Sequence, residues 1–234
     1  MPKISIIIIT KNQGHILKES FPAILAQTEK DYEIIVVDSG SGDDSYRLYK
    51  KYGASVARYT GKGKFNYARA FNIGAEKAKG TYLVRLSGDV IPADKNWLAN
   101  LIAPLRDKTI GAAYSRWLNR PGNRNLFDWY IIAFSMPDHP STFREFPNLI
   151  GASCVVRQDL WQKYRFDPKI RYCEEMDFAA KIQHAGFSVY YASRSRVYHI
   201  HKENFGQFIL RSCQSFRGLL VIFWRYLTKY YRKD

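Results

Sequence analysis

The run of isoleucines between Ile4 and Ile9, ISIIII, constrains the fold of this chain more than any other segment. A nearly unbroken apolar run is typical of a strand that is buried on both faces, as in a parallel sheet. A second such run, EIIVVD at 33–38, follows a predicted amphipathic helix, ILKESFPAILAQ. Pro22 is expected to kink or end the first turns of that helix. The chain therefore begins as strand, loop, helix and strand.

The same alternation continues along the chain. The residue pattern predicts helices at 43–51, 65–80, 93–106 and 174–185, and strands at 54–59, 81–86, 111–117, 152–156 and 188–192. Between them, 118–148 contains four prolines and is predicted to be a long irregular segment of the kind that covers or binds a ligand. Strands that alternate with helices predict an α/β fold with a mostly parallel central sheet flanked by helices.

Polar side chains follow several of the predicted strands. Thr10 ends the first strand, Asp38 ends the second, and Asp89 follows a later strand in the segment LSGDVIP. Open α/β sheets bind ligands outside the carboxyl ends of their strands. These three residues therefore indicate a binding site at that edge of the sheet.

The net charge of +15 indicates an anionic partner, which could be a nucleic acid, a phosphorylated small molecule or an acidic membrane. A nucleic-acid-binding protein is one alternative, but the basic residues are dispersed and form no recognised nucleic-acid module, so we expect no nucleic acid. Three distant cysteines lack metal-binding spacing and suggest a reducing compartment. The N-terminal run lacks signal-peptide features and no segment reaches the ~20 apolar residues of a spanning helix, so a cytoplasmic protein is expected.

The last thirty residues differ from the rest. In 204–234, apolar and aromatic residues recur every three or four positions, with arginines and lysines between them. This pattern predicts an amphipathic helix. Such a helix either lies on an anionic bilayer, at the inner face of the cell membrane, or packs on the core or on a second subunit.

Several segments, taken in order, resemble glycosyltransferase family 2, of the GT-A fold, and most closely its bacterial rhamnosyltransferase-type members. These segments are ISIIIITKN, YEIIVVDSGSGDDS, FNYARAFNIGAEKAKGTYLVRLSGDVIP, GASCVVRQDL, CEEMDFAAKIQHAGF and VYHIH. The resemblance covers residues 3–201, so 1–203 are expected to form the catalytic domain. It implies inverting transfer of a sugar, with dTDP-rhamnose as the favoured nucleotide diphosphate donor, to a hydroxyl of a glycan or lipid-linked glycan during synthesis of a surface polysaccharide or glycolipid. It also implies Mg²⁺ or Mn²⁺.

The resemblance assigns the metal site to LSGDVIP and VYHIH. Asp89 matches the last position of the DxD motif of the family and would bind the metal, while Ser87 stands in place of the first Asp and would contact ribose or a metal-bound water. The alternative is that Asp89 caps a helix that begins near Pro92. His199 and His201 alternate, so on a strand they would share a face and reach the metal or diphosphate; the alternative is that both are structural. The altered motif leaves open a catalytically idle subunit.

The other roles that the resemblance implies concern the nucleotide and the reaction. Thr10, Asn12 and Asp38 would hold the nucleotide base, although the loop after Asp38 could simply form a turn. Asn72 would contact the donor, but Phe71 replaces the Arg that the family usually has before this Asn. Glu175, in EEMD, would be the catalytic base that deprotonates the acceptor hydroxyl. The alternative is that these acidic residues only favour the first turn of a helix.

Overall fold

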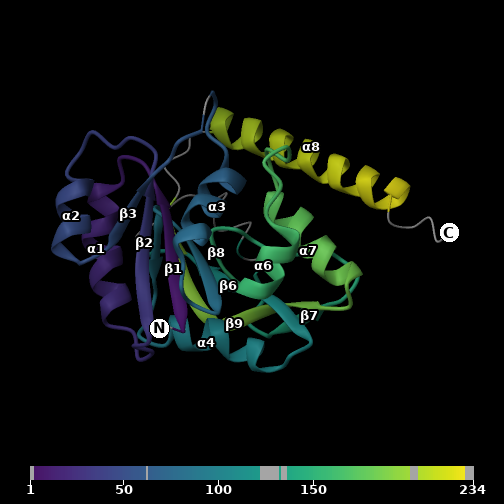
Figure 1. Ribbon diagram of the computed structural model, residues 1–234, viewed down its shortest axis with the longest axis horizontal. Coiled ribbons are helices and arrows are strands. Elements are labelled where there is room, and N and C mark those ends of the chain that lie inside the picture. Colours follow the sequence, from purple (N-terminus) through teal and green to yellow (C-terminus); the bar gives the residue numbers. More distant parts are fainter. Residues whose placement is uncertain (1–2, 62, 122–131, 133–135, 201–204, 230–234) are drawn as a thin grey trace.

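A mixed β-sheet of nine strands forms the centre of the computed structural model, which describes residues 3–61, 63–121, 132, 136–200 and 205–229 (Figure 1). The strands are β1 (Ile4–Thr10), β2 (Tyr32–Asp38), β3 (Ser55–Arg58), β4 (Tyr82–Ser87), β5 (Val90–Pro92), β6 (Ile110–Leu118), β7 (Ser141–Phe143), β8 (Ser153–Arg157) and β9 (Ser188–His199). Their order is β3-β2-β1-β4-β8-β6-β9-β5, with β7 beside β9. The first four strands in that order are parallel, whereas β8 pairs antiparallel with β4 and β6. The predicted α/β fold is confirmed.

Helices cover both faces of the sheet (Figure 1). They are α1 (Gly14–Leu25), α2 (Ser45–Lys51), α3 (Tyr67–Lys77), α4 (Trp97–Ile102), the 3₁₀ helix η1 (Ala103–Arg106), α6 (Gln158–Tyr164), α7 (Glu174–His184) and α8 (Phe205–Lys229). Ile4, Ile6 and Ile8 pack with α1, α2 and α4, whereas Ile7 and Ile9 pack with α3, α6 and α7 on the other face. Every residue of β1 is buried, which explains its continuous apolar sequence.

The structure differs from the sequence-based expectation at some element boundaries. Helix α1 continues through Pro22 to Leu25, so the proline neither ends the helix early nor removes its apolar face from the core. The predicted helix over 93–106 is shorter and is divided into α4 and η1. Strand β9 extends the predicted 188–192 as far as His199, because it pairs with β6 and then with β5. This extension places His199 opposite Val90, the first residue of β5.

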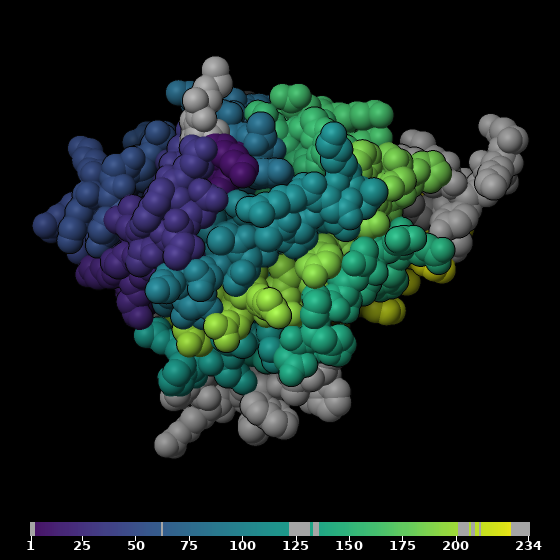
Figure 2. Space-filling model, turned by 90° about the horizontal axis from the view of Figure 1, so that it is seen from below, coloured from purple at the N-terminus to yellow at the C-terminus, as the bar shows by residue number. Residues whose placement is uncertain are grey.

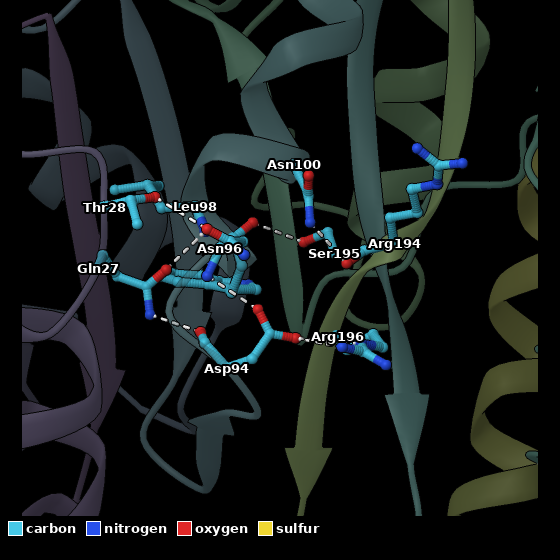
Figure 3. A network of polar contacts seen from close by, with 10 residues as sticks. Gln27, Thr28, Asp94, Asn96, Leu98, Asn100, Arg194, Ser195 and Arg196 are labelled. Carbon is cyan, nitrogen blue, oxygen red and sulfur yellow. Dashed lines mark hydrogen bonds and ion pairs between the residues drawn. The ribbon is translucent and has the colours of Figure 1, made fainter.

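A polar network fixes the connection between β5 and α4 (Figure 3). The Gln27 amide donates to the Asp94 carbonyl at 2.8 Å and accepts from the Leu98 N–H at 3.0 Å. The Asp94 carboxylate pairs with Arg196 of β9 at 2.9 Å, and Asn100 donates to the carbonyl of Arg194 in the same strand. Figure 2 shows α4, β9 and β7 side by side on the lower face, although they are far apart in sequence. The network therefore holds β9 in place beside the segment that follows Asp89.

The predicted C-terminal helix is present as α8, which packs beside α7 (Figure 1). Across the described ranges, none of the helices combines the length and the apolar character that crossing a bilayer requires.

Candidate active site

The carboxyl ends of β1, β2 and β4 lie next to one another and border a cavity. In the parallel register Thr10 pairs with Asp38, and Ile9 pairs with Ser87. The cavity has a volume of about 530 Å³. It is lined by Ile9, Thr10, Lys11, Gln13, Ser39, Tyr59, Gly61, Gly63, Phe65, Tyr67, Ser87, Gly88 and Asp89. Three of the residues predicted from the sequence, Thr10, Ser87 and Asp89, therefore line one cavity.

A second cavity, of about 660 Å³, lies between α4, β7 and β9. None of the residues predicted to bind donor or metal lines it. The smaller cavity at the strand ends therefore remains the candidate active site.

Asn12 binds the loops after β1 and β2 to each other, and Asp38 shapes the second of these loops. Asn12 has a left-handed backbone (φ 52°), accepts from the Gly42 N–H at 2.8 Å and donates its own N–H to Ser41 at 2.9 Å. The buried Asp38 carboxylate accepts from the N–H groups of Gly40 and Ser41, both at 2.8 Å, and from the hydroxyl of Tyr49 at 2.7 Å. Asp38 and Asn12 thus shape the loops that border the cavity, and direct contact of either with a nucleotide base stays a prediction.

The hydrogen bonds of Asp38 also set its ionisation. Burial by itself raises the pKa of the carboxyl, but the hydrogen bonds from Ser41, Tyr49 and Gly40 together outweigh burial and place the pKa below its usual value. Asp38 is therefore a carboxylate at neutral pH.

A tight turn at Gly88 presents Asp89. The Gly88 N–H donates to the carbonyl of Ile9 at 2.8 Å, and a Cβ atom at Gly88 would lie 2.4 Å from the Thr10 hydroxyl oxygen. The chain after Asp89 is strand β5 and not a helix, and α4 begins only at Trp97. Asp89 is therefore not the cap of a helix near Pro92, and it lines the cavity.

The contact at Gly88 gives a first prediction. We expect Gly88→Ala to lower the free energy of unfolding by about 1–3 kcal/mol, because the new methyl group overlaps buried Thr10. Gly42→Ala is the matched control, since no atom lies within 4 Å of a Cβ atom there. Urea denaturation of both variants measures the difference; equal stability of the two would contradict the close packing at Gly88.

Asp89 and His199 form a polar pair next to the turn at Gly88. His199 Nε2 lies 3.4 Å from Asp89 Oδ1, and the two side chains are 11% and 27% exposed, respectively. The edge-to-face contact of the imidazole with Trp117, with ring centres 4.4 Å apart, fixes the plane of the ring. The antiparallel pairing of Val90 with His199 brings them together across more than a hundred residues of sequence. His201 lies outside the described residues.

The side chains of Asp89 and His199 fit a divalent ion that is shared with a diphosphate. Mg²⁺ at nucleotide sites generally takes one or two protein carboxylates and completes its shell with phosphate oxygens and water. An imidazole next to a carboxylate also suits a transition-metal ion such as Mn²⁺. Among the residues that the structure describes, no group of three or more His, Cys, Asp or Glu side chains could hold a metal. A metal ion at Asp89 and His199 would therefore take most of its coordinating atoms from a bound phosphate group and from water.

A buried ion pair connects β4 to α7 and was not predicted from the sequence. Arg85, in the middle of β4, is 6% exposed, and its guanidinium lies 2.9 Å from Glu174 Oε1 and 4.0 Å from Glu175 Oε2. Its signal in the sequence was a single charge inside the apolar strand TYLVRL. A charge at such a position requires a buried partner, and here the partner is the first turn of α7.

The surroundings of Glu175 raise the pKa of its carboxyl. Its side chain is 17% exposed, and Oε1 accepts from the Gly151 N–H at 3.3 Å. Burial and the neighbouring Glu174 raise the pKa of Glu175 to about 7, although Arg85 acts in the opposite direction. A carboxyl with a pKa near 7 can accept a proton from a substrate at neutral pH.

Tyr67 connects the carboxylate cluster with the cavity. It lines the cavity, and its ring lies 5.4 Å from the Arg85 guanidinium. Burial raises the pKa of its hydroxyl, and the charges of Asp89, Glu174 and Glu175 add to that rise while Arg85 opposes it. Tyr67 and Asp89 thus line the same cavity, and Arg85, which lies over the Tyr67 ring, is 4.0 Å from Glu175.

Asn72 is placed away from this group. Its amide donates to the carbonyl of Phe166 at 2.8 Å and accepts from the indole of Trp161 at 2.9 Å. These bonds connect α3 to α6 and to the segment that follows α6, and Asn72 is not among the residues that line the cavity. Its predicted contact with the donor stays a prediction.

Tyr59, Phe65 and Tyr67, which line the cavity, were not predicted as site residues because single aromatics carry no distinctive spacing.

Comparison with known proteins gives one family. The model of Glycosyl transferase family 2 matches residues 5–165. The uncharacterized glycosyltransferase RP339 of Rickettsia prowazekii is 38% identical over 88 residues, which are 38% of this chain and 27% of that protein. The O-antigen chain rhamnosyltransferase RfbN of Salmonella typhimurium is 27% identical over 211 residues, which are 85% of this chain and 67% of that protein.

Solved structures share the fold. The mannosyltransferase PcManGT from Pyrobaculum calidifontis, in complex with GDP-Man and Mn²⁺, superposes with a TM-score of 0.74 at 20% identity. The match covers 97% of this chain and 64% of the mannosyltransferase chain. This chain thus spans about a quarter of RP339 and about two thirds of the other two proteins.

Proposed function

The chain belongs to glycosyltransferase family 2 and has the GT-A fold, and on this basis we propose that it transfers a sugar from a nucleotide diphosphate donor to an acceptor hydroxyl with inversion at the anomeric carbon. One observation carries the proposal. Glu175 lies 4.0 Å from Arg85, whose guanidinium lies over the ring of Tyr67 in the cavity that Asp89 also lines, and burial raises the pKa of Glu175 to about 7. A base and a site for an anionic leaving group are the two parts that this displacement needs.

The chemistry assigns one step to each group. The acceptor oxygen forms a bond to the anomeric carbon while Glu175 takes its proton, and the bond from that carbon to the diphosphate breaks. A divalent ion at Asp89 and His199 would neutralise charge on the diphosphate. Thr10, Ser39 and Ser87 offer hydroxyl groups to the nucleotide, and the aromatic rings of Tyr59 and Phe65 offer faces for a base or a sugar.

The relatives suggest the substrates. RfbN is an O-antigen chain rhamnosyltransferase, and the bound donor in PcManGT is GDP-Man with Mn²⁺. We therefore propose that this chain acts in synthesis of a surface polysaccharide, with dTDP-rhamnose as donor, Mg²⁺ or Mn²⁺ as cofactor, and a glycan or lipid-linked glycan as acceptor.

A binding experiment tests the role of Asp89. We expect Mn²⁺ to tighten the binding of dTDP to the wild-type chain at least tenfold, because the ion connects the carboxylate to the diphosphate, and we expect Asp89→Asn to remove this gain. Isothermal titration of dTDP, UDP and GDP with and without Mn²⁺ measures the effect and identifies the preferred base. Asp31→Asn, at an exposed aspartate of the loop before β2, is the control.

The outcome separates the alternatives. Nucleotide binding that depends on Mn²⁺, without hydrolysis or transfer of any nucleotide sugar, would indicate a catalytically idle subunit. If Mn²⁺ tightens the binding of dTDP to Asp89→Asn as much as to the wild type, Asp89 is not a metal ligand.

A further inference from the structure

We propose that α8 attaches the protein to the surface of an anionic lipid bilayer through its outward apolar side chains. The exposed large apolar residues of the described chain are concentrated on this helix. Eight of them, between 38% and 69% exposed, lie on α8 and are called the outer face here: Ile209, Leu210, Phe216, Leu219, Leu220, Val221, Phe223 and Trp224. The remaining six are scattered over other elements. A contiguous apolar patch on one helix indicates an interaction surface, whereas scattered apolar residues do not.

The opposite side of α8 is already used to attach the helix to the domain. A Cβ atom at Gly218 would lie 2.5 Å from the carbonyl oxygen of Tyr172, so the two backbones touch. Cys173 donates to the carbonyl of Ser215 at 3.5 Å, and Ile222 is buried. Ser215, Gly218 and Ile222 follow one another at three- and four-residue spacing, which defines one side of a helix. The outer face is thus directed away from the domain.

An ion pair fixes the rotation of the helix. Arg225, on the same side as Gly218 and Ile222, lies 2.8 Å from Asp167 and 3.4 Å from Asp177 of α7. With these contacts in place, α8 cannot turn its outer face into the core without breaking the pair. At 100° per residue the outer face spans about 200° of the circumference of the helix, which is the broad apolar surface of a helix that lies in a bilayer interface.

The charge of the helix favours lipid as the occupant. Residues 205–229 contain four basic residues and no aspartate or glutamate, and the whole chain carries a net charge of +15. Basic residues close to an anionic bilayer gain from its negative surface potential. Arg217 is exposed and lies between the apolar residues of the outer face. At a bilayer its guanidinium can extend to the phosphate groups. Pairing of this face with a second copy would instead place Arg217 in an apolar interface.

The attachment of α8 relates the bilayer to the candidate active site, and this step depends on the proposed function. Tyr172 and Cys173, which contact α8, directly precede Glu174 and Glu175 at the start of α7. A bilayer against the outer face would therefore lie on the side of the domain where α7 begins. A glycan acceptor that is carried by a membrane lipid would be concentrated there, near Glu175.

Vesicle flotation tests the proposal. The full chain is mixed with vesicles of phosphatidylcholine alone or of phosphatidylcholine and phosphatidylglycerol in equal parts. We expect the protein to float with the anionic vesicles, and Phe216→Ser/Leu220→Ser/Phe223→Ser to reduce the partition coefficient at least tenfold, because three outward apolar side chains are lost. The control, Leu25→Ser/Val56→Ser/Phe146→Ser, removes exposed apolar residues elsewhere and should float like the wild type.

Further measurements separate membrane binding through α8 from the proposed catalytic role of Glu175. Glu175→Gln should float like the wild type, so a wrong catalytic assignment would leave the flotation result unchanged. The α8 variant should retain the hydrolysis rate of a water-soluble nucleotide sugar and the circular dichroism spectrum of the wild type. Equal flotation of the α8 variant and the control would overturn the proposal. A dimer of the wild type that becomes a monomer in the α8 variant, without flotation of either, would assign the outer face to a second copy.

Discussion

Replacing Glu175 by Gln is expected to lower the rate of sugar transfer by about 10²- to 10⁴-fold while the fold persists. Glutamine keeps the shape of the side chain and can still accept from the Gly151 N–H, but it cannot take a proton from the acceptor hydroxyl. Steady-state transfer with saturating donor and Mn²⁺ measures the effect. Binding of dTDP with Mn²⁺ is expected to be unchanged, because the diphosphate site is assigned to Asp89 and His199.

The control for this prediction is Glu145→Gln, at an exposed glutamate away from the carboxylate cluster, which should transfer at the wild-type rate. Transfer by Glu175→Gln within a factor of two or three of the wild type would show that another group deprotonates the acceptor. A parallel loss of dTDP binding would instead show that Glu175 acts on the donor side.

The raised pKa of Glu175 also predicts a pH dependence. A general base works only when it is deprotonated, and the carboxyl has a pKa of about 7. The transfer rate should thus fall about tenfold per pH unit below pH 7. The profile of kcat/KM against pH measures the acid limb, and Glu175→Gln should lack it. An acid limb near pH 4 in the wild type would exclude Glu175 with this pKa as the base.

Replacing Arg85 by Met is expected to lower the free energy of unfolding by about 3–5 kcal/mol. The guanidinium is buried, and its removal leaves the carboxylates of Glu174 and Glu175 in an apolar region without a cation. Urea denaturation measures the loss. Arg120→Met is the matched control, because the pair of Arg120 with Glu19 is 2.7 Å long but its side chains are 43% and 50% exposed. We expect Arg120→Met to lower the free energy of unfolding by less than about 1 kcal/mol.

A double variant separates the loss of the cation from a general packing defect. In Arg85→Met/Glu174→Met, one of the two carboxylates is also removed, so part of the stability should return relative to Arg85→Met alone. Additive losses from the two substitutions would mean that the cavity left by the guanidinium dominates. A cost of Arg85→Met no greater than that of Arg120→Met would contradict a buried ion pair.

Part of the candidate site followed directly from the sequence. Thr10, Asp38 and Asp89 were predicted at one edge, and the structure pairs Asp38 with Thr10 and places Thr10 and Asp89 along one cavity, together with Ser87, which the family resemblance had implied. Parallel strands in one sheet run in the same direction, so residues that follow such strands meet at one edge whatever the rest of the chain does. The α/β fold was predictable for the same reason, because strand and helix patterns repeat over short stretches of sequence.

The partners of the buried charges came only from the tertiary structure. Arg85 meets Glu174 across 89 positions, and His199 meets Asp89 because β9 continues far enough to pair with β5. The carboxylate of Asp38 accepts hydrogen bonds within the turn that follows it, as the turn alternative allowed, and also from Tyr49, which the turn sequence did not reveal.

The sequence by itself determined most of the elements, although not β5, β7 and α6, and it determined the edge of the sheet where ligands gather and the amphipathic character of residues 204–234. The tertiary structure decided which carboxylates surround the buried Arg85, and which side of α8 faces the domain. The physical reason is that periodicity depends on neighbouring residues, whereas burial and charge pairing depend on strand order and register. Those are properties of contacts between segments that lie far apart in the chain.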